Sequence, residues 1–488
     1  MDILSGSGPD NLGSNPSDSV TTFLPSVKTL TKNSFMAFFR EKVFSKKKKC
    51  MKAIVRRSSI KGEIIAPSSK SYTHRAIAIA SLGEKSDIFY PLISEDTKAT
   101  INAAKCLGAV VEYNEKTRKI TIEGTERSPG TPEDVINAEN SGTTLRFFTA
   151  ISSLCEGAAV LTGDASLRKR PNLPLLRSLN DLGSEAFSTK GDGTAPIVVK
   201  GKLKGGETAM DASISSQFIS ALLIACPLAE KNSYIVANNL TSVPYMRMTT
   251  EILEKAGVTI PFSRSPDNHY SFHVEGGKRY ELRKFTVPGD FSSSSYLLAA
   301  AALTDSEVKI SNLFPSAQGD SRIVEILNEM GADIKWDEGR GIVEVKGAKE
   351  AGLRGIKEDM RENPDLVPTI AVLGAVAEGS TEITGVAHLR YKETDRLRVL
   401  TEELRKMGAR IEEKEDGLLI EGTKRRELKA AKVYSHEDHR LAMALTLAAL
   451  STRGETVIEG AECAEVSYPS FFEDMLGLGA DIKALLKP

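Results

Sequence analysis

Residues 106–124, CLGAVVEYNEKTRKITIEG, contain the pattern that recurs most regularly along this chain of 488 residues. An apolar, helix-like stretch ends at a glycine, and a strand-like hairpin follows it. The pattern occurs six times, and its helix-ending glycines are Gly108, Gly183, Gly257, Gly331, Gly408 and Gly479. They lie 75, 74, 74, 77 and 71 residues apart, which is too regular for chance. The sequence therefore predicts six copies of one structural unit.

A second marker has the same period. A short polar segment opens an apolar helix at SSKSYTHR (68–75), NSGTTLR (140–146), SSQF (215–218), FSSSSY (291–296), PDLVP (364–368) and HEDHR (436–440). Each unit then contains a helix, a strand, a second helix and a hairpin. With parallel crossovers, such a unit is expected to fold as βαβαββ.

The last copy is incomplete, because GADIKALLKP supplies one hairpin strand before the sequence ends. The segment KAIVRRSSIKGEI, residues 52–64, is rich in β-forming residues and can supply the partner. We therefore expect an α/β protein of two lobes with three units each. Lobe I comprises residues 51–67 and 286–488, and lobe II comprises residues 68–285. The alternative, one linear array of six units, does not bring the first strand back to the last unit.

Residues 1–50 are expected to form a disordered extension. They are rich in Ser, Thr, Asn, Pro and Gly and show no apolar period. Their hydroxyl content and the basic run at residues 46–49 weakly resemble an organelle transit peptide. An unstructured extension, or a true start at Met51, explains the same composition, and both alternatives stay open.

Composition excludes several classes of function. Lys plus Arg number 64 and Asp plus Glu 65, which argues against a dedicated nucleic-acid-binding protein. The five cysteines contain no C-x-x-C pair, which argues against a disulfide framework and a zinc site. No apolar run reaches the roughly 18 residues of a membrane span. We expect a cytoplasmic, monomeric protein with no metal, cofactor, nucleic-acid partner or membrane contact.

The polar helix starts predict an anion-binding cleft. Repeat symmetry points the helix starts of one lobe in one direction, and a helix N-terminus attracts anions. Each charged cluster alone is typical of a solvated surface, and FSSSSY is explained by capping. Five of the six regions, however, carry anion-binding groups: Lys70, Ser71 and Arg75; Gly142 and Arg146, with Arg168, Lys169 and Arg170; Ser215, Ser216 and Gln217; Lys392 and Arg396; and Asp438, His439 and Arg440.

The same segments resemble the enolpyruvyl transferase family. The matching motifs, in family order, are SKSYTHR (69–75), NSGTTLR (140–146), RP (170–171), SSQ (215–217), PD (364–365), KETDR (392–396) and DHR (438–440). The resemblance implies two lobes of three βαβαββ units, an inverse α/β barrel. It also implies an enzyme that transfers the enolpyruvyl group of phosphoenolpyruvate to the 5-hydroxyl of shikimate 3-phosphate and releases phosphate, by addition and elimination. Both substrates carry a carboxylate and a phosphate, which fits the clustered cations.

The resemblance also implies residue roles. Asp365 would be the base for the 5-hydroxyl, Glu393 the acid–base group at the vinyl carbon, and Lys70 a third catalytic group. The implied phosphoenolpyruvate ligands are Lys70, Gly142, Arg170, Gln217, Arg396 and Arg440. The implied shikimate 3-phosphate ligands are Lys70, Ser71, Arg75, Ser215, Ser216, Gln217, Ser242, Asp365, His388 and Lys392.

Three positions depart from the family pattern. Val466 stands where the family has a nearby lysine, which puts one phosphoenolpyruvate contact in doubt. Phe147 follows Arg146 where many members have proline, and His388 stands where many have asparagine. His388 can be either a substrate ligand or a loop residue without a role.

Two rival functions are compatible with parts of the pattern. A sister enzyme that acts on a UDP-sugar typically has a reactive cysteine in the loop at residues 163–175, which here contains none. A catalytically inactive anion-binding scaffold would not need an acid–base pair such as Asp365 and Glu393. An assay of phosphate release with each acceptor separates the three functions.

Overall fold

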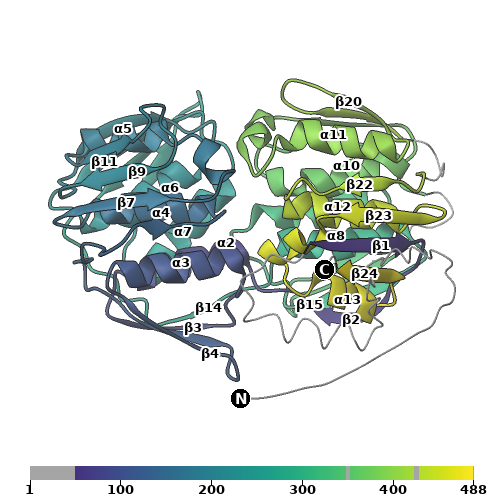
Figure 1. Ribbon diagram of the computed structural model, residues 1–488, viewed down its shortest axis with the longest axis horizontal. Coiled ribbons are helices and arrows are strands. Elements are labelled where there is room, and N and C mark those ends of the chain that lie inside the picture. The colour runs from purple at the N-terminus through teal and green to yellow at the C-terminus, as the bar shows by residue number, and fades with distance from the viewer. Residues whose placement is uncertain (1–49, 348–351, 423–427, 487–488) are drawn as a thin grey trace, which may run out of the picture.

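The computed structural model describes residues 50–347, 352–422 and 428–486 of the chain. It consists of two lobes that lie side by side (Figure 1). The expectations for the extension, including the basic run at residues 46–49, fall outside the described residues except for Cys50, which is exposed. The described strands form six sheets of four strands each.

Every sheet has the topology that the repeats predict. The unit of α4 has the strand order β6-β7-β9-β8, in which β7 is parallel to β6 and antiparallel to β9. The hairpin partner β8 is antiparallel to β9. This is the predicted βαβαββ unit. Its elements are β6 Ile136–Asn137, α4 Gly142–Ser152, β7 Ala158–Thr162, α5 Leu173–Asp181, β8 Glu185–Ser188 and β9 Ile197–Lys200.

The other two units of the same lobe repeat this order (Figure 1). The first contains β14 Lys284–Thr286, α2 Lys70–Ala80, β3 Lys85–Phe89, α3 Glu95–Cys106, β4 Val110–Asn114 and β5 Lys119–Glu123. The third contains β10 Gly206–Asp211, α6 Gln217–Ala225, β11 Ser233–Asn238, α7 Val243–Lys255, β12 Phe262–Arg264 and β13 Tyr270–Val274.

The second lobe contains the remaining three units. The fourth has β2 Lys61–Ile65, α8 Phe291–Leu303, β15 Glu307–Ser311, α9 Ile323–Glu329, β16 Asp333–Asp337 and β17 Ile342–Lys346. The fifth has β18 Lys357–Asp359, α10 Val367–Val376, β19 Ser380–Thr384, α11 Arg396–Lys406, β20 Arg410–Glu413 and β21 Leu418–Glu421. The sixth has β22 Lys432–Tyr434, α12 His439–Ala449, β23 Glu455–Glu459, α13 Phe471–Gly477, β24 Ile482–Leu486 and β1 Met51–Arg56.

The helices that open with polar segments form the interior of the lobes. Helices α8, α10 and α12 contact one another, and nearly all of their residues are buried. Helices α2, α4 and α6 occupy the same place in the other lobe. Each lobe has its own hydrophobic cluster, with the sheets packed outside the helices. This arrangement agrees with the expected inverse α/β barrel, and it requires helices that are apolar on every side.

The six repeat glycines end helices as predicted. Gly108, Gly183, Gly257, Gly331, Gly408 and Gly479 all have φ between 85° and 105°. A side chain is strained in this left-handed region, so glycine is the residue that closes the helix and turns the chain into the hairpin.

The segment at residues 52–64 supplies the missing strand of the last unit, as expected, and a second strand that joins another sheet. Strand β1 lies between β23 and β24 and does complete the sixth sheet, whereas β2 pairs with β15 in the fourth sheet. The chain leaves the sixth sheet at Ser58, whose hydroxyl donates to the Arg56 carbonyl and accepts from the Asp481 amide.

The chain passes between the lobes at residues 66–69 and 287–290, where Ser68 and Gly289 form an isolated bridge. Asp290 joins the first helices of both lobes at this point. Its Oδ2 accepts from the Lys70 amide at 3.0 Å, and its Oδ1 accepts from the Ser293 amide at 3.1 Å. The limits 51–67 with 286–488 and 68–285 remain our proposal for the two lobes, although Thr286 is the last residue of β14 and pairs with Phe89 in lobe II.

Candidate active site

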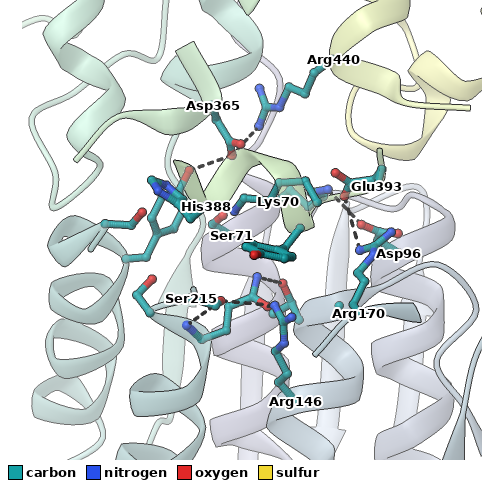
Figure 2. Close-up of a pocket in the computed structure, with 18 of the residues that line it drawn as sticks. Lys70, Ser71, Asp96, Arg146, Arg170, Ser215, Asp365, His388, Glu393 and Arg440 are labelled. Atoms are coloured by element: carbon teal, nitrogen blue, oxygen red, sulfur yellow. Dashed lines mark hydrogen bonds and ion pairs between the residues drawn. The ribbon is translucent and has the colours of Figure 1, made fainter. Parts of the chain in front are cut away.

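A pocket lies between the lobes (Figure 2). Side chains at the starts of α2, α4, α6 and α12 line it, together with the segments that precede α10 and α11. Every residue to which the resemblance gave a catalytic or ligand role lines this one pocket, whereas the anion-binding candidates Arg168, Lys169 and Asp438 do not. The lining residues with such a role are Lys70, Ser71, Arg75, Gly142, Arg170, Ser215, Ser216, Gln217, Ser242, Asp365, His388, Lys392, Glu393, Arg396 and Arg440.

Capping explains why helices begin at the pocket. The hydroxyl of Ser69 accepts from the Tyr72 amide, and the hydroxyl of Ser141 accepts from the Thr144 amide. First-turn amides that such caps leave unbonded can face an anion, although the Lys70 amide in α2 is already bound by Asp290. None of the residues of FSSSSY lines the pocket, as predicted, but the capping residue of α8 is Asp290, which precedes these serines.

The lining is strongly cationic. It contains seven lysines and arginines but only three carboxylates, those of Asp96, Asp365 and Glu393. The whole chain has a formal net charge of −1. A local excess of positive charge in a near-neutral protein is suited to a small ligand with several negative charges.

Arg396 connects the carboxylates of the site. Its side chain is 2% exposed, and its Nε donates to Asp438 Oδ2 at 2.8 Å. Its Nη1 donates to Asp365 Oδ1 at 3.0 Å, and its Nη2 donates to Glu393. Burial lowers the pKa of Arg396, but the three carboxylates outweigh burial and raise it above its ordinary value.

Asp365 lies where three donors meet. Arg396 binds its Oδ1, while Arg440 Nη2 and the Tyr245 hydroxyl bind its Oδ2 at 3.0 and 2.8 Å. Burial alone would raise the pKa of Asp365, but Arg440 and Arg396 hold it well below its ordinary value. Asp365 is therefore ionised and able to accept a proton.

Glu393 is held in a similar way from the opposite side of the pocket. Arg170 Nη1 lies 3.6 Å from its Oε1, and Arg396 binds its Oε2. Burial would raise the pKa of Glu393, but Arg396 and Arg170 keep it well below its ordinary value. The Ser166 hydroxyl from the other lobe also donates to the Glu393 carbonyl at 2.9 Å. Without a ligand, Glu393 is thus ionised and carries no proton to donate.

Lys70 has a partner that the sequence did not indicate. Its Nζ lies 2.9 Å from Asp96 Oδ2, at the start of α3 (Figure 2). Asp96 is 7% exposed and lines the pocket. Its only local signal is a place in the first turn of a capped helix, which is common for structural acids.

Residues at the starts of α4 and α6 form one wall of the pocket. Arg146 Nη1 donates to Gln217 Oε1 at 2.7 Å and to Ser215 Oγ at 3.2 Å. A Cβ added to Gly142 would meet Arg170 Nη1 at 3.3 Å. Burial lowers the pKa of Arg146 to about 9. The neighbouring basic residue Arg168 donates to the Gly163 carbonyl and does not line the pocket.

Arg75 is fixed by contacts on all sides. Its Nε donates to Thr249 Oγ1, and its two terminal nitrogens donate to the carbonyls of Ser71 and Tyr245. Its guanidinium carbon lies 5.3 Å from the ring centre of Phe147. Phe147 is fully buried and does not line the pocket. This residue, which departs from the family pattern, therefore stabilises Arg75 through its ring and does not contact the ligand.

His388 faces the pocket and is 5% exposed. Its Nε2 has no hydrogen-bond partner among the described residues. Burial and the charge of Lys392 lower the pKa of His388 to about 3, so the ring is neutral. Of the two alternatives for this residue, its position favours a ligand-facing group.

Four lining residues were not singled out from the sequence: Asp96, Thr143, Tyr245 and Tyr391. Arg146 and His439 were expected among the anion-binding groups of the cleft, without an assigned ligand, and both line the pocket. Tyr245 lies in the first turn of α7, and only the tertiary structure brings it to Asp365. In the described segment at residues 461–470, around Val466, no side chain lines the pocket.

No group of three or more His, Cys, Asp or Glu side chains within residues 50–347, 352–422 and 428–486 could hold a metal ion. Within the same ranges, no helix is both long and apolar enough to cross a membrane.

Two lobes of three βαβαββ units with a cationic pocket between them are the features of the enolpyruvyl transferase class. The model of the EPSP synthase family (3-phosphoshikimate 1-carboxyvinyltransferase) matches residues 54–475. The chain therefore belongs to the EPSP synthase family and is a transferase of the shikimate pathway.

Individual relatives agree with this assignment. A 3-phosphoshikimate 1-carboxyvinyltransferase of Methanococcoides burtonii is 53% identical over 433 residues, which cover 88% of this chain and 99% of the relative. That of Methanosarcina acetivorans is 51% identical over 437 residues, covering 89% and 99%. These matches extend over nearly the full length of both relatives.

Solved structures show the same fold. The EPSP synthase of Acinetobacter baumannii is 28% identical with a TM-score of 0.75, covering 89% of this chain and 99% of that one. The enolpyruvyl transferase NikO of Streptomyces tendae is 19% identical with a TM-score of 0.72, covering 90% and 100%. The second likeness concerns the fold alone.

Proposed function

We propose that this pocket transfers the enolpyruvyl group of phosphoenolpyruvate to the 5-hydroxyl of shikimate 3-phosphate and releases inorganic phosphate. The observation that carries the proposal is the position of Asp365 and Glu393, two ionised carboxylates joined through Arg396 within one cationic pocket. A scaffold that only bound anions would be weakened by these carboxylates, because they repel its ligand.

Asp365 is the base for the 5-hydroxyl. The hydroxyl oxygen attacks C2 of phosphoenolpyruvate while its proton passes to Asp365. Arg396, Arg440 and Tyr245 fix the orientation of the carboxylate and keep it ionised before substrate arrives. In the second step, that proton leaves with the departing phosphate.

Glu393 is the acid–base group at C3. It protonates the methylene carbon during addition and removes a proton from the resulting methyl group during elimination. Glu393 is ionised without a ligand, so it must first take up a proton. Binding of the anionic substrate causes this uptake. The charges of the substrate share Arg396 and Arg170 with Glu393 and so raise the pKa of that carboxyl.

The remaining groups bind the anions. Lys70, Gly142, Arg170, Gln217, Arg396 and Arg440 bind phosphoenolpyruvate. Arg440 is well suited to this role, since its Nε and Nη1 are buried and have no partner among the described residues. The groups that bind shikimate 3-phosphate are Lys70, Ser71, Arg75, Ser215, Ser216, Gln217, Ser242, Asp365, His388 and Lys392.

We also infer that the enzyme works as a cytoplasmic monomer. Residues of a single chain line the whole pocket, so no second subunit is needed to complete it. All five cysteines are free thiols, which agrees with a reducing compartment. Light scattering of the purified enzyme tests the monomer, and cell fractionation tests the location.

One assay tests the proposed activity. Phosphate release is measured with phosphoenolpyruvate and either shikimate 3-phosphate or a UDP-sugar as acceptor. Release that requires shikimate 3-phosphate supports the proposal. Release only with the UDP-sugar favours the sister reaction, and binding of phosphoenolpyruvate without release with either acceptor favours a scaffold.

A further inference from the structure

Glu403 is a buried carboxylate outside the pocket, on the helix that also carries Arg396. It lies two turns further along α11, is 1% exposed, and does not line the pocket. Its carboxylate accepts from His436 Nε2 at 2.7 Å, from the Tyr434 amide at 3.1 Å and from Lys406 Nζ at 2.7 Å. Burial would raise the pKa of Glu403, but these donors lower it, so the group is ionised.

One of these donors, His436, lies in the turn between β22 and α12, and the Tyr434 amide lies at the end of β22, directly before the turn. His436 and Glu437 in this turn have φ of 53° and 59°, a left-handed backbone conformation that residues other than glycine rarely adopt. Such a conformation persists only where the surrounding structure holds it. The turn is therefore strained, and Glu403 binds it at His436.

The next residue, Asp438, connects the turn to the site. Asp438 is fully buried, and its carboxylate binds Arg396 Nε at 2.8 Å and the Arg440 amide at 2.9 Å. Helix α11 thus touches the turn at two points, with Arg396 at Asp438 and Glu403 at His436. The conformation of the turn fixes where Asp438 places the guanidinium of Arg396.

We propose that Glu403 is a positioning residue for the reaction. By binding His436 and Tyr434, it holds the strained turn that directs Asp438 toward Arg396 and Arg440. This inference rests on the proposed function, in which those two arginines bind phosphoenolpyruvate. Without the hydrogen bonds of Glu403 to His436 and Tyr434, the turn relaxes and Asp438 shifts. A misplacement of about 1 Å in an active site can cost roughly 100-fold in rate.

The first test compares Glu403→Gln with Glu402→Gln. Glu402 is the preceding, half-exposed residue, which pairs with Arg398 at 3.9 Å on the surface. Glu403→Gln keeps the volume but removes the charge that holds His436. We expect kcat/KM for phosphoenolpyruvate to fall about tenfold, within the roughly 100-fold range of such misplacements. We expect the KM for shikimate 3-phosphate to change less than about twofold, because its ligands lie on other segments, and Glu402→Gln to match wild type.

The second test is rescue by Glu437→Gly in the Glu403→Gln background. Glycine adopts the left-handed conformation without strain, so the turn no longer depends on Glu403. We expect kcat/KM of the double variant to be about threefold higher than that of Glu403→Gln. A carboxylate that merely stabilised the fold would not be rescued in this way.

The outcomes separate this inference from the proposed function. Wild-type kinetics in Glu403→Gln, an equal rise of KM for both substrates, or failure of the rescue overturns the positioning role while the activity stands. A wild-type enzyme that releases no phosphate from the two substrates overturns the proposed function, and this inference with it. If Glu403→Gln does not fold, His436→Gln replaces it, since that side chain is 28% exposed. A loss of about threefold with the same selectivity for phosphoenolpyruvate supports the inference, and no loss overturns it.

Discussion

Arg440 binds Asp365 with only one of its three side-chain nitrogens. Its Nη2 lies 3.0 Å from Asp365 Oδ2, whereas Nε and Nη1 are buried and have no partner among the described residues. Unsatisfied donors of a buried cation are costly, so they are expected where a ligand completes them. The pair thus holds a base and presents an anion-binding group at the same point.

Arg440→Lys should therefore weaken phosphoenolpyruvate binding. A lysine cannot reach both the carboxylate and the ligand with a planar fork of donors. We expect kcat/KM for phosphoenolpyruvate to fall by a factor of about 30 to several thousand, corresponding to about 2–5 kcal/mol. Steady-state kinetics measure this loss. Arg398→Lys, at a side chain 61% exposed on α11, is the matched control and should leave kinetics unchanged.

Gly142→Ala should narrow the pocket. The added Cβ would lie 3.3 Å from Arg170 Nη1 and 3.7 Å from Gln217 Oε1, so the ligand loses space beside two of its proposed contacts. We expect the KM for phosphoenolpyruvate to rise about tenfold with a smaller change in kcat, as for lost binding contacts. Gly477→Ala is the control, because a Cβ there meets nothing within 4 Å. Equal kinetics of the two variants would refute the placement of Gly142.

Binding of phosphoenolpyruvate should take up protons. Arg396 and Arg170 keep the pKa of Glu393 well below its ordinary value, and an anion that shares these cations raises it. At a pH between the pKa of Glu393 in the free enzyme and its higher pKa in the complex, Glu393 is protonated only in the complex. The affinity for phosphoenolpyruvate should therefore increase as the pH falls through this window. Calorimetric titration in buffers of different ionisation enthalpy measures the uptake. Glu393→Gln should abolish its contribution, and an unchanged proton count in that variant would contradict the proposal.

Strand β1 should be indispensable to folding. It lies between β23 and β24, and its Met51, Ala53 and Val55 side chains are buried. A chain that begins at Cys50 keeps every described strand and should unfold cooperatively and remain active. A chain that begins at Lys61 loses β1 and leaves β24 without its partner, so we expect no cooperative thermal transition for that lobe. A stable, active enzyme from the shorter chain would contradict the assignment of β1 to the sixth sheet.

The repeats predicted the architecture because they depend on local rules. Gly408, for example, ends a helix at φ 85° and turns the chain into a hairpin, which sequence spacing alone can reveal. The division of residues 52–64 between two sheets was not predictable, since β1 and β2 have similar composition. Their separation depends on which partners, β23 with β24 or β15, the tertiary fold brings near.

The site was predictable where motifs lie at helix starts. Lys70 and Arg440 are examples, because repeat symmetry brings such starts to one cleft. Asp96 and Tyr245 were not assigned to it, because they lie in the first turns of α3 and α7, which are not among the six repeated helix-start segments. They reach the pocket through packing between elements distant in sequence, as the 2.8 Å contact of Tyr245 with Asp365 illustrates. A single sequence contains no signal for such a contact.

The most direct test of the account is turnover in heavy water, followed by mass spectrometry of the methylene group of phosphoenolpyruvate and of the product. Addition passes through a methyl group, so the wild-type enzyme should incorporate deuterium. Glu393→Gln cannot exchange the proton, and loss of acid–base catalysis costs about 10²–10⁴ in rate, so exchange and turnover should disappear together. Turnover by the wild type without deuterium in the methylene would contradict addition and elimination. Wild-type exchange in Glu393→Gln would show that another group carries the proton, with Lys70 the next candidate.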